Sequence, residues 1–234
     1  MLPTRELQNS VRFIRERGYG IVSSVFSPAE LSLALSELSS TGLKRSRAGA
    51  RHVLSLASVS EIARRGELLA IARAVVGPDA IPFRATFFDK SPNSNWLVAW
   101  HQDTALPLAF RSETPGWGPW STKDGVIYAH APAAALQQVL ALRVHFDRST
   151  AVNGPLRVIP GTQELGVLTD EEILRRAGQS GAIACTVAAG GVVAMRPLVL
   201  HASCKSESGE PRRVLHIEYA RSRGTGDGLE LALV

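Results

Sequence analysis

Three residues of metal-binding types have a spacing that suits a shared ion. His101 and Asp103 lie two residues apart, and His201 lies 98 residues beyond Asp103. On an extended strand, side chains two residues apart point to the same face, so His101 and Asp103 can bind one ion. A second histidine would complete the two-histidine, one-carboxylate set of non-haem Fe(II) sites, which leaves coordination positions open. The His-x-Asp triplet alone is a weak signal, because it occurs by chance in many chains.

An arginine is predicted near this site. Arg212 follows His201 by eleven residues and begins the next predicted strand. A tight hairpin between the two strands can therefore bring its guanidinium near the metal.

The elements that would position these residues are mostly short strands. They are separated by Gly, Pro and Asn turns, and most of the predicted helices lie near the start of the chain. This pattern predicts a mainly β protein with flanking helices and a double-stranded β-helix core of the jelly-roll or cupin type. The predicted helices are 5–17, 27–40, 58–76 and 170–177, and the main strands are 21–26, 81–90, 96–103, 139–147, 157–160, 182–187, 192–195, 197–201 and 212–219.

The length of 234 residues fits a single domain spanning 1–234. Residues 1–80 are predicted to form a helical flank, and 81–222 the jelly-roll core. A long connection, 104–138, contains Trp117, Trp120 and Tyr128. Connections of this length are often functional, so we expect a lid-like insert, although the tryptophans would also suit a role in filling the core. The basic, glycine-containing segment 41–52 is predicted to be a mobile loop.

Composition excludes several classes of protein. The chain is 45% hydrophobic and 20% charged, which fits a folded globule, and its net charge is +5. The basic residues are scattered and no nucleic-acid-binding motif is present, so we expect no nucleic-acid partner. Positive charge inside a cleft could equally well bind an anionic small molecule. The two cysteines, Cys185 and Cys204, form no disulfide framework, and no signal or membrane-spanning run is present; these features predict a cytoplasmic protein.

Five ordered motifs together resemble the phytanoyl-CoA dioxygenase family of Fe(II)/2-oxoglutarate oxygenases, from about Thr86 to Tyr219. Their order and spacing make the combination far more specific than the His-Gln-Asp triplet alone. The motifs are Phe87-Phe88-Asp89-Lys90, His101-Gln102-Asp103, Asn153-Gly154-Pro155-Leu156 continuing to Pro160-Gly161-Thr162, Met195-Arg196-Pro197-Leu198 before His201, and Arg212.

The resemblance implies an enzyme that hydroxylates a C–H bond of a small molecule, using Fe(II), 2-oxoglutarate and O2 and releasing succinate and CO2. His101, Asp103 and His201 would be the iron ligands. Arg212 would hold the distal carboxylate of 2-oxoglutarate. Further cosubstrate contacts are implied for Ser203, Thr86, Gln102 and Arg143. At the position of Arg143 some members carry tryptophan, so this arginine is either a second cation in the pocket or part of a buried ion pair.

The substrate is not defined by the resemblance. Candidate contacts are Trp117, Trp120, Tyr128 and His130, with Lys123 and Arg111 available for an amphiphilic or anionic molecule. His145 and His216 are interpreted as structural or supporting residues. Two alternatives remain: a metal-dependent hydrolase or isomerase that does not use 2-oxoglutarate, and a catalytically silent small-molecule binding module.

Overall fold

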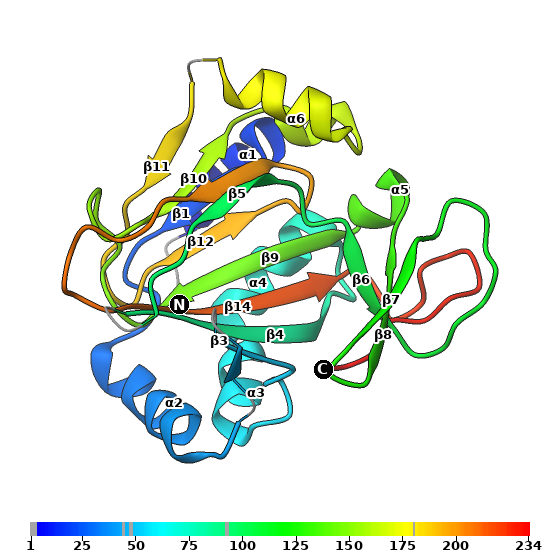
Figure 1. Cartoon of the computed structure of the whole chain (residues 1–234). Coiled ribbons are helices and arrows are strands. Elements are labelled where there is room, and N and C mark those ends of the chain that lie inside the picture. Colours follow the sequence, from blue (N-terminus) through cyan, green and yellow to red (C-terminus); the bar gives the residue numbers. More distant parts are fainter. Residues whose placement is uncertain (1–3, 44, 47–48, 92–93, 180) are drawn as a thin grey trace.

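The computed structural model describes residues 4–43, 45–46, 49–91, 94–179 and 181–234, and within these ranges it contains three antiparallel sheets. The seven-stranded major sheet has the order β1 (Tyr19–Val22), β12 (Val192–Met195), β9 (Val139–His145), β14 (Arg212–Ala220), β4 (Ile81–Lys90), β3 (Gly49–Arg51) and β2 (Arg45–Ser46). The four-stranded minor sheet has the order β11 (Ile183–Cys185), β10 (Leu156–Ile159), β13 (Leu200–Ser203) and β5 (Val98–His101). The minor sheet lies over one face of the major sheet (Figure 1). This two-layer arrangement confirms the predicted mainly β, jelly-roll fold.

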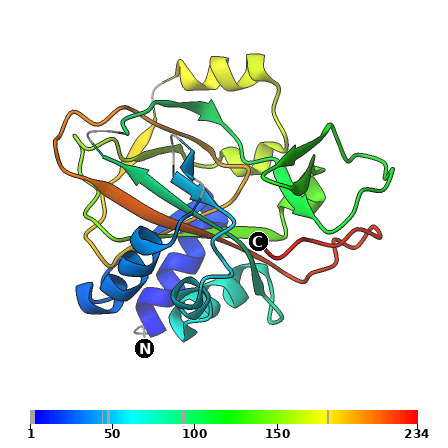
Figure 2. The ribbon, with the colours of Figure 1, turned by 60° about the horizontal axis from the view of Figure 1, so that its bottom comes forward.

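The opposite face of the major sheet is covered by four helices: α1 (Thr4–Arg17), α2 (Pro28–Ser40), α3 (Ala57–Ala63) and α4 (Gly66–Val76) (Figures 1 and 2). Helix α4 contacts β9 and β14, and its Leu68 and Ile71 are fully buried in one cluster with Leu142 and Leu215. Because β9 is covered on both faces, all of its seven residues are buried. Removing this apolar surface from water is the main force that holds the helices on the sheet.

Several local predictions are confirmed. Helix α2 begins with the expected capping box, in which the Ser27 hydroxyl accepts from the backbone of Glu30 and the Glu30 carboxylate accepts from the backbone of Ser27. Helix α6 (Asp170–Ala177) has the predicted bounds and also begins with a capping box, formed by Thr169 and Glu172. Two further short helices are η1 (Thr162–Leu165) and α5 (Ala133–Leu136).

The first 80 residues contribute more to the sheet than predicted. Strands β1, β2 and β3 all join the major sheet, so the flank is not purely helical. The segment 41–52 was predicted as a loop, yet β3 pairs with β4. The single helix predicted over 58–76 is two helices, because the chain turns at Arg64 and Arg65 between α3 and α4.

The long connection 104–138 is an ordered sheet rather than an irregular loop. Its strands β6 (Ala105–Leu108), β7 (Trp120–Lys123) and β8 (Val126–His130) form the three-stranded sheet, in the order β6-β8-β7. The C-terminal segment, residues 229–234, packs along it: Ala109 N donates to Glu230 O (2.9 Å) and Ala232 N to Pro107 O (3.0 Å). These three strands were not predicted, because glycines and prolines interrupt the alternation of apolar and polar residues in this stretch.

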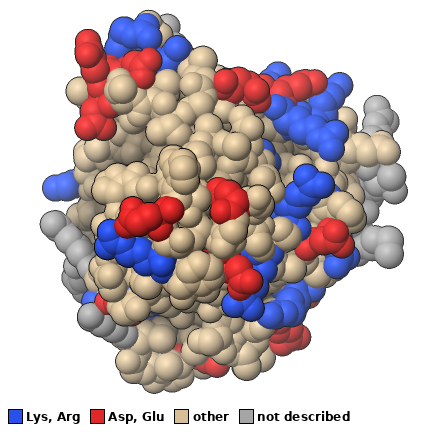
Figure 3. Space-filling view, turned by 90° about the vertical axis from the view of Figure 1, so that its right-hand side faces the viewer, with Lys and Arg blue, Asp and Glu red and all other residues tan. Residues whose placement is uncertain are grey.

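Charge is distributed over the surface in small groups. On the face seen in Figure 3, lysine and arginine side chains lie close to acidic side chains rather than in one broad basic area. Within the described ranges, no helix combines the length and apolar character that crossing a membrane requires.

Candidate metal centre

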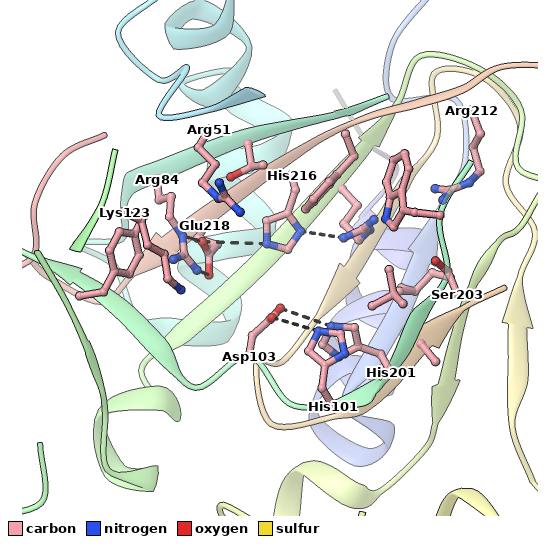
Figure 4. A pocket seen from close by; sticks show the side chains of 18 residues that line it. Arg51, Arg84, His101, Asp103, Lys123, His201, Ser203, Arg212, His216 and Glu218 are labelled. Carbon is pink, nitrogen blue, oxygen red and sulfur yellow. Dashed lines mark hydrogen bonds and ion pairs between the residues drawn. The ribbon is translucent and has the colours of Figure 1, made fainter. Parts of the chain in front are cut away.

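The two histidines and the aspartate converge where β5 pairs with β13 in the minor sheet. His101 is the last residue of β5, and its partner in the antiparallel register is His201 on β13. Asp103 follows two residues later, and its backbone N–H donates to the carbonyl of Pro197 (2.9 Å). One carboxylate oxygen of Asp103 lies 3.5 Å from His101 Nε2 and the other lies 3.4 Å from His201 Nε2 (Figure 4). One ligand atom from each residue falls within 4.8 Å of the others.

The hydrogen bonds of the two imidazoles orient their lone pairs towards the centre. His101 Nδ1 lies 2.8 Å from the carbonyl of Ala99, and His201 Nδ1 lies 2.9 Å from that of Val199. A carbonyl only accepts, so we infer that each Nδ1 carries the proton and each Nε2 presents a lone pair. Burial alone would raise the pKa of Asp103, but the charge and hydrogen bonds of the two imidazoles, when these are protonated, hold it well below its usual value, so Asp103 is a carboxylate. Two neutral nitrogens and a carboxylate fit a divalent transition metal.

These three residues line a cavity of about 300 Å³ between the sheets. Five of the nine predicted cosubstrate and substrate contacts also line it, as do Lys123 and His216. The five contacts come from β4, β8, β9, β13 and β14, and are Thr86, Tyr128, Arg143, Ser203 and Arg212. The volume is at the lower end of the usual range for ligand pockets, about 300–1,000 Å³, which suits small ligands.

One end of the cavity is formed by Arg212. This side chain is only 3% exposed, and its Nε donates to the carbonyl of Asn153 (3.3 Å). Its Nη1 is buried without a partner among the described residues. Burial, and secondly the charge of Arg143, lower the pKa of Arg212 to about 9. Burial destabilises a guanidinium whose charge is uncompensated and whose N–H donor lacks an acceptor. A carboxylate bound beside Arg212 would both neutralise the charge and accept the hydrogen bond.

Arg143 is a second cation in the cavity. Its Nη1 donates to His216 Nδ1 (2.9 Å), and its guanidinium lies 5.2 Å from the centroid of the Phe88 ring. The pKa of His216 lies well below its usual value, because of burial and then of Arg143. The imidazole is therefore neutral, with its proton on Nε2, which faces Glu218 at 4.0 Å. Of the two interpretations offered for Arg143, the structure matches a cation in the pocket, held by a neutral imidazole.

Four of the expected contact residues are not among those that line the cavity. The amide of Gln102 points away from it, donating to the carbonyls of Gly166 and Leu198 and accepting from Leu168 N, so its position indicates a structural role. Trp117 is buried and donates to Asp227 (2.6 Å). His130 lies 2.7 Å from the Thr104 hydroxyl, and Trp120 packs beside Arg111.

Lys90 is an important residue that the sequence analysis did not single out as a site residue. Its side chain is 1% exposed, and its Nζ donates to Ser203 Oγ (3.1 Å) and to the carbonyl of Cys204 (2.6 Å). Burial, followed by the charge of Arg212, lowers the pKa of Lys90 to about 8. Lys90 therefore fixes Ser203 and adds positive charge behind the Arg212 end.

A buried ion pair was also missed. Arg84 donates two hydrogen bonds to Glu218 and a third, 3.1 Å long, to the carbonyl of Ala105, just beyond Asp103. Burial alone would lower the pKa of Arg84, but Glu218 outweighs it and holds the pKa above its ordinary value. Arg84 and Thr86 are two residues apart on β4, and His216 and Glu218 are two residues apart on β14, so polar residues on one face of apolar strands were the available signal.

The fold and the two-histidine, one-carboxylate centre define a jelly-roll protein with a site suited to one metal ion. The chain belongs to the phytanoyl-CoA dioxygenase (PhyH) family, whose profile matches residues 14–214. A curated relative, "L-proline trans-4-hydroxylase" of Streptomyces griseoviridis, is 27% identical over 192 residues. The match covers 71% of this chain and 64% of the relative, so the chain spans less than two thirds of the relative's length.

Solved structures share the fold. EctD from S. alaskensis, in its apoform, superposes with a TM-score of 0.70 at 17% identity, covering 94% of this chain and 77% of that one. HygX from Streptomyces hygroscopicus, with nickel and 2-oxoglutarate bound, gives 0.65 at 16% identity, covering 94% and 87%.

Proposed function

We propose that the chain is an Fe(II)/2-oxoglutarate-dependent dioxygenase that hydroxylates a C–H bond of a small molecule, with release of succinate and CO2. One observation carries this proposal: the three convergent ligand residues and the unpartnered Nη1 of Arg212 belong to one cavity. When a metal binds one end of a dicarboxylate, the carboxylate at the other end needs a cation as its partner. The cavity offers a metal site for the first end and Arg212 for the second.

Each residue has a defined task in this proposal. His101, Asp103 and His201 hold the iron, which with 2-oxoglutarate and O2 supplies the oxidising chemistry when bound. Arg212 binds the distal carboxylate through its free donor, and the Ser203 hydroxyl, fixed by Lys90, donates a second hydrogen bond to it. Arg143 contributes a further positive charge, and Thr86 borders the same pocket.

The relatives support this function rather than either alternative. They include a proline hydroxylase and a protein whose structure has 2-oxoglutarate bound. The buried guanidinium of Arg212 favours an oxygenase over a hydrolase or isomerase that does not use 2-oxoglutarate, and the complete ligand set favours an enzyme over a silent binding module. A cytoplasmic location, without a nucleic-acid or membrane partner, completes the proposal.

The direct test combines binding and turnover. Isothermal titration calorimetry under nitrogen is expected to show 2-oxoglutarate binding to the Fe(II)-loaded protein and no binding after chelation of the metal. In air, the Fe(II) protein is expected to form succinate from 2-oxoglutarate, and EDTA to abolish its formation. Metal-independent 2-oxoglutarate binding, or no binding with Fe(II), would contradict the proposal.

A further inference from the structure

Positive charge in the cavity exceeds what the metal and cosubstrate require. Five cations and two carboxylates line it. Of the carboxylates, Asp103 belongs to the metal centre and Glu218 is paired with Arg84. A divalent metal and the dianionic 2-oxoglutarate cancel one another, so the loaded cavity stays electropositive. Such a cavity attracts an anionic ligand, because low-dielectric walls strengthen the field inside it.

Three of the five cations lie at the end remote from Arg212, and Lys123 is the one among them for which the described residues provide no ion-pair partner. Figure 4 shows Lys123, Arg84 and Arg51 on one side of the metal centre and Arg212 on the other. Lys123 comes from β7, and its ammonium lies 4.8 Å from the centroid of the Tyr128 ring. It makes no hydrogen bond or ion pair with any residue that the structure describes. An ammonium group has three donors, so Lys123 has unused hydrogen-bonding capacity facing the cavity.

Arg51 extends this cationic end to the mouth of the cavity. It lies at the end of β3 and pairs with Asp124, in the turn after β7, at 3.6 Å. The side chain of Arg51 stays 44% exposed, so its planar fork can also reach a ligand. The pKa of Lys123 is lowered by burial and then by the charges of Arg84 and Arg51. This repulsion would be relieved by an anion between Lys123 and Arg51.

We propose that Lys123 and Arg51 form a subsite for an anionic group of the substrate, either a carboxylate or a phosphate. The anion would be held at this end while the remainder of the molecule extends towards the metal centre. This inference rests on the proposed function, since it identifies the substrate class of the same site. The cavity volume of about 300 Å³, shared with 2-oxoglutarate, suits a small molecule.

The test uses three probes that share a cyclohexyl group: cyclohexanecarboxylate, cyclohexyl phosphate and the neutral cyclohexanecarboxamide. Each is titrated calorimetrically, under nitrogen, into the Fe(II) protein saturated with 2-oxoglutarate, which keeps the Arg212 end occupied. At least one anion is expected to bind about tenfold more tightly than the carboxamide, as suits a charge-assisted contact in a confined site. The better of the two anions identifies a carboxylate or a phosphate as the natural group.

Variants assign the preference to the named residues. The double variant Lys123→Gln, Arg51→Gln is expected to lose the preference, and Lys123→Arg to keep it. Arg111→Gln is the matched control: Arg111 lies in the same 104–138 segment, is paired with Glu113 at 3.3 Å, and does not line the cavity. It is expected to retain the wild-type preference.

Three results would overturn the subsite: equal binding of the amide and both anions, no binding of either anion at millimolar concentration, or a preference that survives in the double variant. These outcomes are distinct from failure of the proposed function. A protein that binds 2-oxoglutarate with iron but shows no anion preference refutes the subsite alone. A protein that does not bind 2-oxoglutarate with iron refutes the function first.

Discussion

His101 and His201 face each other across paired strands, although one hundred residues separate them in the sequence. The register between β5 and β13 shifts immediately afterwards, between His201 and Ser203. Irregularities of this kind redirect side chains and are common beside active sites. Here the shift lies between His201, which is assigned to the metal, and Ser203, which is assigned to the cosubstrate. The pairing of β5 with β13 therefore positions both residues.

Removing the anionic ligand tests the metal centre. Asp103→Asn keeps the shape of the side chain but removes its charge, so iron-dependent succinate formation is expected to fall by at least about a hundredfold, as for loss of an essential site group. Asp89→Asn, on β4 but outside the cavity lining, is the control and is expected to retain activity. Wild-type turnover in Asp103→Asn would remove this residue from the centre.

Two adjacent arginines provide a matched comparison for the cosubstrate. Arg212→Gln is expected to raise the KM for 2-oxoglutarate about tenfold or more, because a charge-assisted carboxylate contact is lost. The neighbouring Arg213 instead pairs with Asp147 at 2.7 Å, and Arg213→Gln is expected to leave this KM unchanged. Steady-state kinetics at varied 2-oxoglutarate distinguishes them, and equal effects in the two variants would contradict the assignment.

Gly154 is predicted to be indispensable for reasons of space as well as backbone conformation. Its φ is +69°, and an added Cβ would lie 2.6 Å from the carbonyl of Cys204 and 3.1 Å from Lys90 Nζ. Gly161 has a similar φ, +82°, but open space around it. Gly154→Ala is expected to destabilise the protein by about 2 kcal/mol or more and to weaken 2-oxoglutarate binding, whereas Gly161→Ala should show only the backbone cost of about 1 kcal/mol. Urea unfolding and calorimetry measure both; equal losses would exclude the steric explanation.

The lowered pKa of Lys90 predicts a particular dependence of stability on pH. Its pKa is about 8 in the folded protein and 10.5 at its reference value, so between these pH values the unfolded chain binds more protons. The contribution of Lys90 to the free energy of unfolding should therefore rise as the pH increases from 8 to 10.5. Urea unfolding over this range is expected to show a smaller rise in Lys90→Met than in the wild type. Lys205→Met, at an exposed position, is the control and should follow the wild type.

Trp117 is expected to affect stability rather than substrate binding. Trp117→Phe removes the indole donor to Asp227 and should lower the free energy of unfolding by about 1–3 kcal/mol, since the acceptor is charged. Substrate-dependent kinetics should be unchanged. Trp120→Phe, at a half-buried position, should be less destabilising. Unchanged stability with altered substrate kinetics in Trp117→Phe would restore its predicted role as a substrate contact.

The fold and the candidate metal ligands could be predicted from two kinds of sequence pattern. Local patterns indicate the strands and helices, and motifs in a fixed order along the chain indicate the ligand residues. Alternation of apolar residues gave the main strands, and the capping pattern at Ser27 and Glu30 gave the start of α2. The convergence of His101, Asp103 and His201 followed from the family motifs that record their order, although the strand predicted over 96–103 ends at His101 and Asp103 lies beyond it.

The remaining features depend on contacts that spacing alone does not specify. Gln102 lies between two ligand residues, yet strand alternation turns its amide to the opposite face, as the period of two implies. Lys90 was visible only as part of a motif, because its role depends on pairing of β4 with β14, which brings it beside Arg212. The pairing of Arg84 with Glu218 joins residues 134 apart in the sequence, and no local pattern identifies such partners.

The C-terminal segment determines which parts of the cavity wall can move. Val234 exchanges backbone hydrogen bonds of 2.8 Å with Phe83 and Ala85 on β4, while Ala232 binds β6 at Pro107. These backbone hydrogen bonds connect the three-stranded sheet to the major sheet. Outward movement of the three-stranded sheet would have to break them. Across the mouth, by contrast, Arg51–Asp124 and His52–Tyr128 are side-chain contacts, and an exposed ion pair contributes only about 0–1 kcal/mol. We therefore expect ligand entry at this end of the cavity to require only side-chain rearrangement, on the nanosecond scale rather than that of domain motion.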